Sequence, residues 1–135
     1  TKLVDSLLSM IKFQNGEIMV SGDFFPYNKP NKIRNLNKIC SGYSREDIAY
    51  AVQFVLEKIM LDLINYFVPK GSNLCLSGGV ALNCVANGKL HRSGLFKNIW
   101  IQPAASDAGG ALGAALYESY VNQNFKRKFK FFRKI

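Results

Sequence analysis

Two neighbouring stretches of the chain each join a short apolar run to small residues and then to a helical pattern. The first covers residues 73–91 and the second covers residues 97–116. Apolar runs of three or four residues that end at glycine or proline are typical of strands, so each stretch predicts a strand, a turn and a helix. Such units in succession predict an α/β fold in which helices pack on a sheet.

The first turn, Ser77-Gly78-Gly79, follows a strand expected over residues 74–76 and precedes a helix expected from Val80 to about His91. Paired glycines permit positive φ angles and leave room for another group close to the backbone. A helix whose N-terminus faced this loop would favour an anionic or polar ligand there, and a nucleotide is the obvious candidate. The motif alone is equally compatible with a tight turn that holds no ligand.

The second turn begins at Pro103 and leads through Asp107 into a helix that opens with Gly109 and Gly110. Asp107 can cap this helix, or its carboxylate can hold a divalent metal, and the spacing alone favours capping. The carboxyl ends of parallel strands share one edge of a sheet, so we expect Asp107 and the glycine loop to face one crevice. Gly109 and Gly110 suggest a ligand over the first turn, whereas Gly113 suggests close packing between helices.

Both stretches together carry a family resemblance. Residues 76–90 read Leu-Ser-Gly-Gly-Val-Ala-Leu-Asn-Cys-Val-Ala-Asn-Gly-Lys-Leu, and residues 102–117 read Gln-Pro-Ala-Ala-Ser-Asp-Ala-Gly-Gly-Ala-Leu-Gly-Ala-Ala-Leu-Tyr. Motifs of this length, in this order, resemble those of the carbamoyltransferases of the nodulation and antibiotic-biosynthesis type, which belong to the actin-like ATPase superfamily. A looser similarity extends upstream over residues 15–25 and 47–56.

The resemblance implies a half-domain of the actin-like ATPase fold, which is RNase H-like and has a mixed sheet. It also implies an ATP-dependent enzyme that activates carbamoyl phosphate as carbamoyl-adenylate and passes the carbamoyl group to a hydroxyl of a small-molecule acceptor. Carried over to this sequence, Ser77, Gly78, Gly79 and Asn83 would bind the nucleotide, and Asp107 would be a catalytic metal ligand. The implied cofactors are ATP and a divalent metal, iron or magnesium.

This sequence departs from the family at the metal site, which also uses two histidines upstream. The chain has one histidine, His91, which matches neither of them and is expected to be an exposed residue at a helix end. The family's phosphate-binding hairpins and adenylate-forming domain are missing as well. We therefore expect a fragment of a longer enzyme, inactive alone, whose partners include the remaining domains.

Two other functions stay open. The tRNA threonylcarbamoyl transferases have a similar Ser-Gly-Gly-Val motif with an equivalent asparagine and aspartate, so the acceptor could be a tRNA. The residues of the second motif, Gln102-Pro-Ala-Ala and Asp107-Ala-Gly-Gly-Ala-Leu, argue against this alternative. Alternatively, the chain is a non-catalytic module that binds a nucleotide or a partner. Its last residues, 125–135, interleave phenylalanine with lysine and arginine. Such a tail could bind nucleic acid or a membrane surface, but we favour a junction to a missing domain.

The rest of the chain divides into an N-terminal hairpin with a long surface connection over 1–43 and a nucleotide-binding α/β core over 44–124. Ser44-Arg-Glu-Asp47 resembles a capping box, and Pro69 ends the helix that follows. One apolar face is predicted for this helix, comprising Ile48, Val52, Val55, Ile59, Leu63 and Phe67.

Before Ser44, apolar residues over 1–13 have a helical spacing, but Asn15-Gly16 predicts a hairpin between strands at 10–13 and 17–20. The two predictions compete for residues 10–13, and the Asn-Gly pair favours strand. Residues 21–40 contain prolines, asparagines and a glycine without a regular period, which predicts a long surface connection.

Composition and the distribution of apolar residues predict one modest core and argue against a membrane-spanning or disulfide-rich protein. A hydrophobic content of 48% over 135 residues is enough for one modest core. No apolar run is long enough to cross a membrane and no leader pattern is present, so we expect a cytoplasmic protein without membrane contact. Cys75 and Cys84 are expected to be buried, and all three cysteines to be reduced. The net charge of +9 is concentrated in the tail, and we do not expect nucleic acid as a partner.

Overall fold

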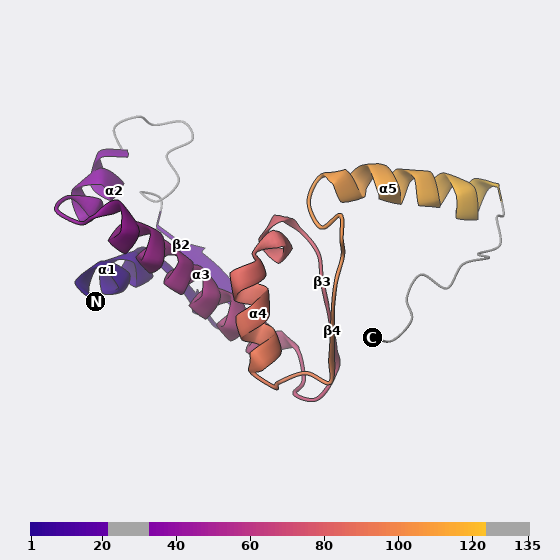
Figure 1. Ribbon diagram of the computed structural model, residues 1–135, viewed down its shortest axis with the longest axis horizontal. Helices are drawn as coiled ribbons and strands as arrows, with labels where there is room; N and C mark the ends of the chain where they lie inside the picture. Colours follow the sequence, from indigo (N-terminus) through magenta and orange to yellow (C-terminus); the bar gives the residue numbers. More distant parts are fainter. Residues whose placement is uncertain (22–32, 124–135) are drawn as a thin grey trace.

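The structure, a computed structural model, describes residues 1–21 and 33–123 of the chain (Figure 1). The basic tail at residues 125–135 therefore lies outside the described residues, as does most of the stretch predicted to connect the hairpin to the long helix. The described residues form an α/β arrangement of helices with two small sheets. Their order along the chain is helix, hairpin, two helices, and then two strands with a helix between them and another after them.

The N-terminal segment satisfies both of the patterns that compete in its sequence. Helix α1 spans Lys2–Met10, and strands β1 (Ile11–Gln14) and β2 (Glu17–Val20) pair antiparallel directly after it. The hairpin turn places Asn15 and Gly16 at φ angles of 53° and 85°. These positive angles at both central residues are those of the two-residue turn that Asn-Gly favours. The hairpin prediction is thus confirmed, and the helix ends where the strand begins.

Helix α2 (Ile33–Cys40) corrects the prediction of an irregular connection over residues 21–40. Leu36, Ile39 and Cys40 pack against a buried cluster formed with α1 and the long helix α3. The asparagines in this segment lower helix propensity, but they do not prevent a helix whose apolar side chains find a partner. Residues 22–32 lie outside the described part.

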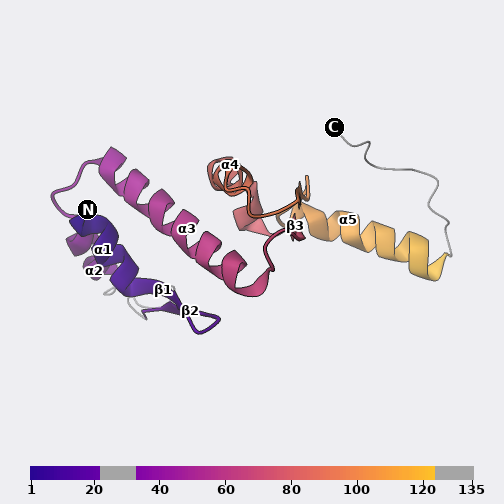
Figure 2. The ribbon, with the colours of Figure 1, turned by 90° about the horizontal axis from the view of Figure 1, so that it is seen from below.

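Helix α3 (Arg45–Phe67) begins at the predicted cap. The Ser44 hydroxyl oxygen accepts a hydrogen bond from the Asp47 backbone N–H at 3.0 Å and donates one to the Asp47 carboxylate at 2.7 Å. The helix ends before Pro69, as predicted. Figure 2 shows α3 as one long helix between α1 and α2 at one end and the second sheet at the other.

The buried face of α3 differs from the predicted one. Val52 and Phe67 are exposed, although both belong to the apolar spacing read from the sequence. Val55 and Ile59 of the predicted face are buried, as expected, and Ile48 and Leu63 are half-buried. Ala51, Met60 and Ile64, which lie outside the predicted face, are buried as well. The helix has different partners along its length, and their positions rather than the apolar spacing decide which side chains are covered.

Strands β3 (Asn73–Leu76) and β4 (Asn98–Ile101) are parallel, with Leu74 opposite Ile99 and Cys75 opposite Trp100. This confirms the parallel pair. Within residues 1–21 and 33–123, however, β1–β2 and β3–β4 are separate two-stranded sheets, so the predicted single mixed sheet is not formed there. One face of β3–β4 packs on helices through Leu74, Leu76 and Ile99, while the other exposes Cys75 and Trp100.

A 3-10 turn (Gly79–Leu82) separates β3 from helix α4 (Cys84–Arg92). The prediction of a continuous helix from Val80 to His91 was therefore wrong at its start. Asn83 is the N-cap of α4, and a residue that caps a helix has extended backbone, which breaks the helical path at that point. His91 is exposed in the last turn of α4, as predicted.

Helix α5 (Ala108–Tyr117) extends away from the rest of the molecule and continues into a π-helical turn at Glu118–Asn122 (Figure 1). None of its residues is buried, although the helix is almost entirely apolar. Cys75 and Cys84 are exposed too, which corrects the prediction that they belong to a core; all three cysteines are free thiols. Among the described residues, no helix is both long and apolar enough to cross a membrane.

We expect Leu90→Ala to lower the free energy of unfolding by about 2–5 kcal/mol, because Leu90 of α4 is fully buried against α3 and β3 and its truncation leaves a cavity. Leu82→Ala is the matched control: Leu82 is 56% exposed, and its truncation should change stability by about 0.5 kcal/mol or less. Urea denaturation followed by circular dichroism measures both. Equal effects of the two substitutions would show that the cluster around Leu90 is not formed.

Candidate functional site

A cleft of about 510 Å³ lies at the carboxyl ends of β3 and β4. This volume is in the range of small-molecule sites. The prediction that Asp107 and the glycine loop face one crevice is confirmed, because both line the cleft. Its lining residues are mostly small: Ser77, Gly78, Gly79, Gln102, Ala104, Ala105, Ser106, Asp107, Gly109 and Gly110.

The glycine loop and the segment after β4 are joined by a backbone hydrogen bond. The Gly78 N–H donates to the Ala105 carbonyl at 2.6 Å, and Ala105 is itself buried. Gly78 has a φ angle of 92°, where a side chain would be strained, and a Cβ at Gly78 or Gly79 would meet no atom within 4 Å. The loop thus presents bare backbone to the cleft.

The helix after the glycine loop does not direct its free N–H groups at the cleft, contrary to the prediction. The Gly79–Leu82 turn stands between them, and the Asn83 side chain accepts a hydrogen bond from the Ala86 N–H at 3.0 Å. That bond satisfies one of the unpaired donors of the first turn of α4. The partner of this N–H is therefore the Asn83 side chain rather than a ligand in the cleft.

Asp107 lines the cleft from the start of α5, and its side chain makes no capping hydrogen bond. The favoured prediction that Asp107 caps the helix was therefore wrong. Its backbone has helical φ and ψ angles, unlike the extended backbone that directs a capping side chain back to the helix. The exposed carboxylate remains available to a ligand, and its role as a metal ligand stays a prediction.

The glycines of α5 have different surroundings. A Cβ at Gly109 would lie too close to the Ala104 carbonyl oxygen, so this position requires glycine for packing between α5 and the segment before it. A Cβ at Gly110 or at Gly113 would meet nothing within 4 Å. Gly110 therefore remains the candidate for a close ligand, whereas the helix packing predicted at Gly113 is not found among the described residues.

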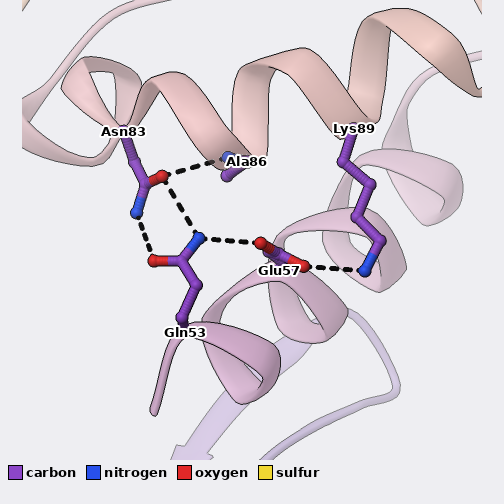
Figure 3. A network of polar contacts seen from close by, with 5 residues as sticks. All are labelled: Gln53, Glu57, Asn83, Ala86 and Lys89. Carbon is purple, nitrogen blue, oxygen red and sulfur yellow. Dashed lines mark hydrogen bonds and ion pairs between the residues drawn. The ribbon is translucent and has the colours of Figure 1, made fainter. Parts of the chain in front are cut away.

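Asn83 belongs to a polar network outside the cleft rather than to its lining (Figure 3). Its amide exchanges two hydrogen bonds with Gln53 of α3, at 2.9 and 3.2 Å. Gln53 donates to Glu57 at 2.8 Å, and Glu57 accepts from Lys89 at 2.7 Å. The structure thus places six of the seven predicted site residues around the cleft and sets Asn83 apart; its contact with a nucleotide stays a prediction.

Glu57 is a buried acid, with 7% of its surface exposed. The hydrogen bond from the Lys89 ammonium, followed by that from Gln53, holds the pKa of its carboxyl below the ordinary value of 4.5. The positive charges of Lys89 and Arg92 act in the same direction, and burial opposes them. Glu57 is therefore an anion at neutral pH.

Sequence reasoning missed Gln102 and Ser106 in the cleft and Gln53 and Glu57 in the network. Gln102 directly follows β4, at the sheet edge where ligands bind, so its position could have identified it. Glu57 lies between buried positions of α3, and an acid at such a position requires a partner. That partner, Lys89, is distant in sequence, and no local pattern identifies it.

The described residues do not complete a metal site. No group of three or more histidine, cysteine, aspartate or glutamate side chains lies close enough together to hold an ion within residues 1–21 and 33–123. Asp107 is the single carboxylate among the residues that line the cleft. A cation there would need further ligands from beyond this part of the chain.

Comparison with known proteins identifies relatives over most of the chain. The family model described as "Carbamoyltransferase N-terminus" matches residues 9–116. An uncharacterized protein of Synechocystis is 60% identical over 87 residues, which are 61% of this chain and 14% of that protein. Nodulation protein NolO of Bradyrhizobium diazoefficiens is 49% identical over 75 residues, 54% of this chain and 14% of that protein.

Nodulation protein U of Sinorhizobium fredii is 36% identical over 85 residues, which are 59% of this chain and 15% of that protein. The matched part of the chain thus spans about one seventh of the length of these curated relatives. No solved structure matches the chain.

We expect Gly109→Ala and Gly110→Ala to have opposite effects on stability. Gly109→Ala should lower the free energy of unfolding by about 1–3 kcal/mol, because the added methyl group collides with the Ala104 carbonyl. Gly110→Ala should raise it by up to about 1 kcal/mol, since the position is helical and open. Urea denaturation compares them. A stabilising Gly109→Ala would contradict the close contact between α5 and Ala104.

We expect the stability contributed by Glu57 to disappear in acid. Its pKa is lower in the folded chain than the ordinary 4.5 of the unfolded chain, so the contribution is complete above about pH 4.5 and is lost as the pH falls through the folded-state pKa. The stability difference between wild type and Glu57→Gln, measured by urea denaturation at a series of pH values, should therefore be large at pH 7 and shrink towards pH 3.

Asp62→Asn is the control, because it removes a carboxylate from the exposed Lys58–Asp62 pair on the same helix. It should change stability by about 1 kcal/mol or less at pH 7. A wild-type advantage over Glu57→Gln that grew in acid would show that the carboxylate is not stabilised by its partners.

Proposed function

The chain belongs to the carbamoyltransferase N-terminus family, and on this premise we propose that its cleft binds ATP during carbamoyl transfer. The reaction we propose is that of the family it resembles: carbamoyl phosphate is activated with ATP as carbamoyl-adenylate, and the carbamoyl group then passes to a hydroxyl of a small-molecule acceptor. The observation that carries the proposal is the position of the cleft, between the glycine loop and Asp107 at the carboxyl edge of parallel strands.

The lining of the cleft supports a nucleotide. Gly78, Gly79 and Gly110 leave open space where a side chain would otherwise stand, so a phosphate or ribose can approach the backbone closely. Ser77 and Ser106 add hydroxyl groups, and Gln102 adds an amide, all of which can form hydrogen bonds with a polar ligand. The chain itself would bind and orient the nucleotide at this wall.

We further propose that Asp107 supplies one ligand to a divalent cation, iron or magnesium, at the same wall. Carboxylate oxygen is a suitable ligand for either ion. When bound, the cation would stabilise negative charge that develops on the reacting group. Asp107 is the single carboxylate among the described residues that line the cleft, so further charged ligands would come from elsewhere.

The remaining parts of a longer carbamoyltransferase are the partner that we propose for this chain. Leu112, Leu116 and Tyr117 of α5 are exposed apolar side chains. The relatives are several times longer than the segment that matches them, so they contain polypeptide that could cover such surfaces. The actin-like fold of the whole remains part of this proposal.

Titration of the chain with ATP, followed by isothermal calorimetry with and without magnesium chloride, tests the proposal. Gly79→Asp should weaken binding at least about tenfold, because a carboxylate in the loop would repel the phosphates at short range. Gly113→Asp is the matched control: it introduces the same charge at another open glycine that does not line the cleft. It should bind ATP as wild type does.

Either of two results would contradict the ATP site. One is wild-type protein that binds no ATP under both conditions, and the other is equal weakening by Gly79→Asp and Gly113→Asp.

A further inference from the structure

The network of Gln53, Glu57, Asn83 and Lys89 connects α3 to α4, from its N-cap Asn83 to Lys89 in its last turn (Figure 3). It is a continuous chain of hydrogen bonds from the Ala86 backbone N–H at one end to the Lys89 ammonium at the other. Glu57, near the middle of α3, is nine-tenths buried, whereas Lys89 is about half exposed. Buried polar groups of this kind are costly unless all their partners are present.

The two ends of the network fix the direction of every bond between them. The Ala86 N–H can only donate, so it requires the carbonyl oxygen of Asn83, and the Asn83 amino group then faces the Gln53 carbonyl at 2.9 Å. The Gln53 amino group is thereby directed at Glu57.

Glu57 must therefore accept hydrogen bonds on both sides. One of its oxygens accepts from Gln53 and the other from Lys89, and each of these partners is a donor. Only a carboxylate of this size offers two acceptors. A glutamine would set its own amino group against either Gln53 or the Lys89 ammonium, and one contact would become repulsive.

Asn83 transmits this arrangement to the wall of the cleft. The residue directly follows the Gly79–Leu82 turn, and Asn87 on the next turn of α4 donates to the Ala81 carbonyl at 2.8 Å. The Ala81 N–H donates to the Gly78 carbonyl at 3.0 Å, and the Gly78 N–H donates to the carbonyl of Ala105, another lining residue, at 2.6 Å. The glycine loop is thus connected to α3 through the network.

We propose that Gln53 and Glu57 are positioning residues for the cleft: the Glu57 carboxylate, paired with Lys89, orients both amides and so holds the glycine loop in the conformation that lines the cleft. In this arrangement Asn83 acts as a helix cap and as the link between α3 and the loop. The significance of the loop position for nucleotide binding rests on the proposed function. The positioning itself is a property of the free protein.

Amide hydrogen exchange measured by NMR on the full 135-residue chain tests the proposal. The probes are the bonded amides of Gly78, Ala81 and Ala86, and the references are those of Ile48 and Gly71, which are bonded at the start of α3 and before β3. Exchange rates report how often each bond opens.

Glu57→Gln should accelerate exchange at the three probe amides by about tenfold or more, because a buried network with one repulsive contact opens readily. The reference amides should change less than about twofold. Asp62→Asn is the matched control, since it also removes the carboxylate of a lysine pair on α3, and it should leave all five rates near those of wild type.

Substitutions of Lys89 provide a second test if Glu57→Gln fails to fold, since Lys89 is half exposed. Lys89→Met removes the charge that fixes the carboxylate and should accelerate exchange at the probe amides. Lys89→Arg keeps the charge, so its exchange rates should stay close to those of wild type. Equal acceleration at probes and references would overturn the proposal, because it would indicate a purely structural role. Unchanged rates at the probes would overturn it as well.

ATP affinity separates this proposal from the proposed function. If both hold, Glu57→Gln weakens ATP binding while Asp62→Asn does not. If wild-type protein binds no ATP but the probe amides alone respond to Glu57→Gln, the ATP proposal fails and the positioning role stands. If ATP binds equally to wild type and to a Glu57→Gln variant with accelerated probes, the positioning role stands, and its significance for nucleotide binding is overturned.

Discussion

Burial of helix α3 against two different partners is the constraint on which the rest of the described structure depends. Ala51, Val55 and Ile59 are buried against α1 and α2, whereas Met60 and Ile64, further along the helix, are buried against α4 and β3. A two-stranded sheet such as β3–β4 has little stability by itself. The parallel pair, and with it the cleft, is held in place because one face of the sheet packs on this helix and on α4.

The polar network occurs at the junction between these two buried clusters. Glu57 lies on α3 between Val55 and Ile59, and its partners reach it from α4 and from the same helix. An apolar contact at this point would tolerate small rotations of α4, because apolar packing is not directional. Hydrogen bonds with fixed donors and acceptors do not, so the network gives the loop before α4 a defined position. Stability and orientation thus come from different interactions on the same helix.

Exposed apolar residues mark the surfaces on which the described part of the chain lacks a covering layer. Helix α5 buries none of its residues, and the second face of β3–β4 exposes Cys75 and Trp100. Parallel sheets in α/β proteins normally have both faces covered. The relatives in the carbamoyltransferase family, of which the matched segment is about 14%, are long enough to contain such a covering layer.

The sequence by itself determined the elements whose signals are local. The Asn15-Gly16 turn, the Ser44 cap, the parallel strands β3 and β4, and the shared crevice of Asp107 and the glycine loop all follow from residue types that favour one backbone conformation or one strand end. The two long motifs also identified the family, because each of them is a long specific run of residues in and around a turn that leads into a helix.

Tertiary structure decided the features that depend on partners distant in sequence. It chose which face of α3 is buried and formed α2 from a segment with weak helical propensity. It also left the Asp107 side chain without a capping hydrogen bond, because Asp107 itself has helical φ and ψ angles. It also drew Asn83 into a network with Gln53, 30 residues away, and Lys89 into a pair with Glu57, 32 residues away. Local propensity cannot determine such contacts, since their free energy exists only when the helices are already packed together.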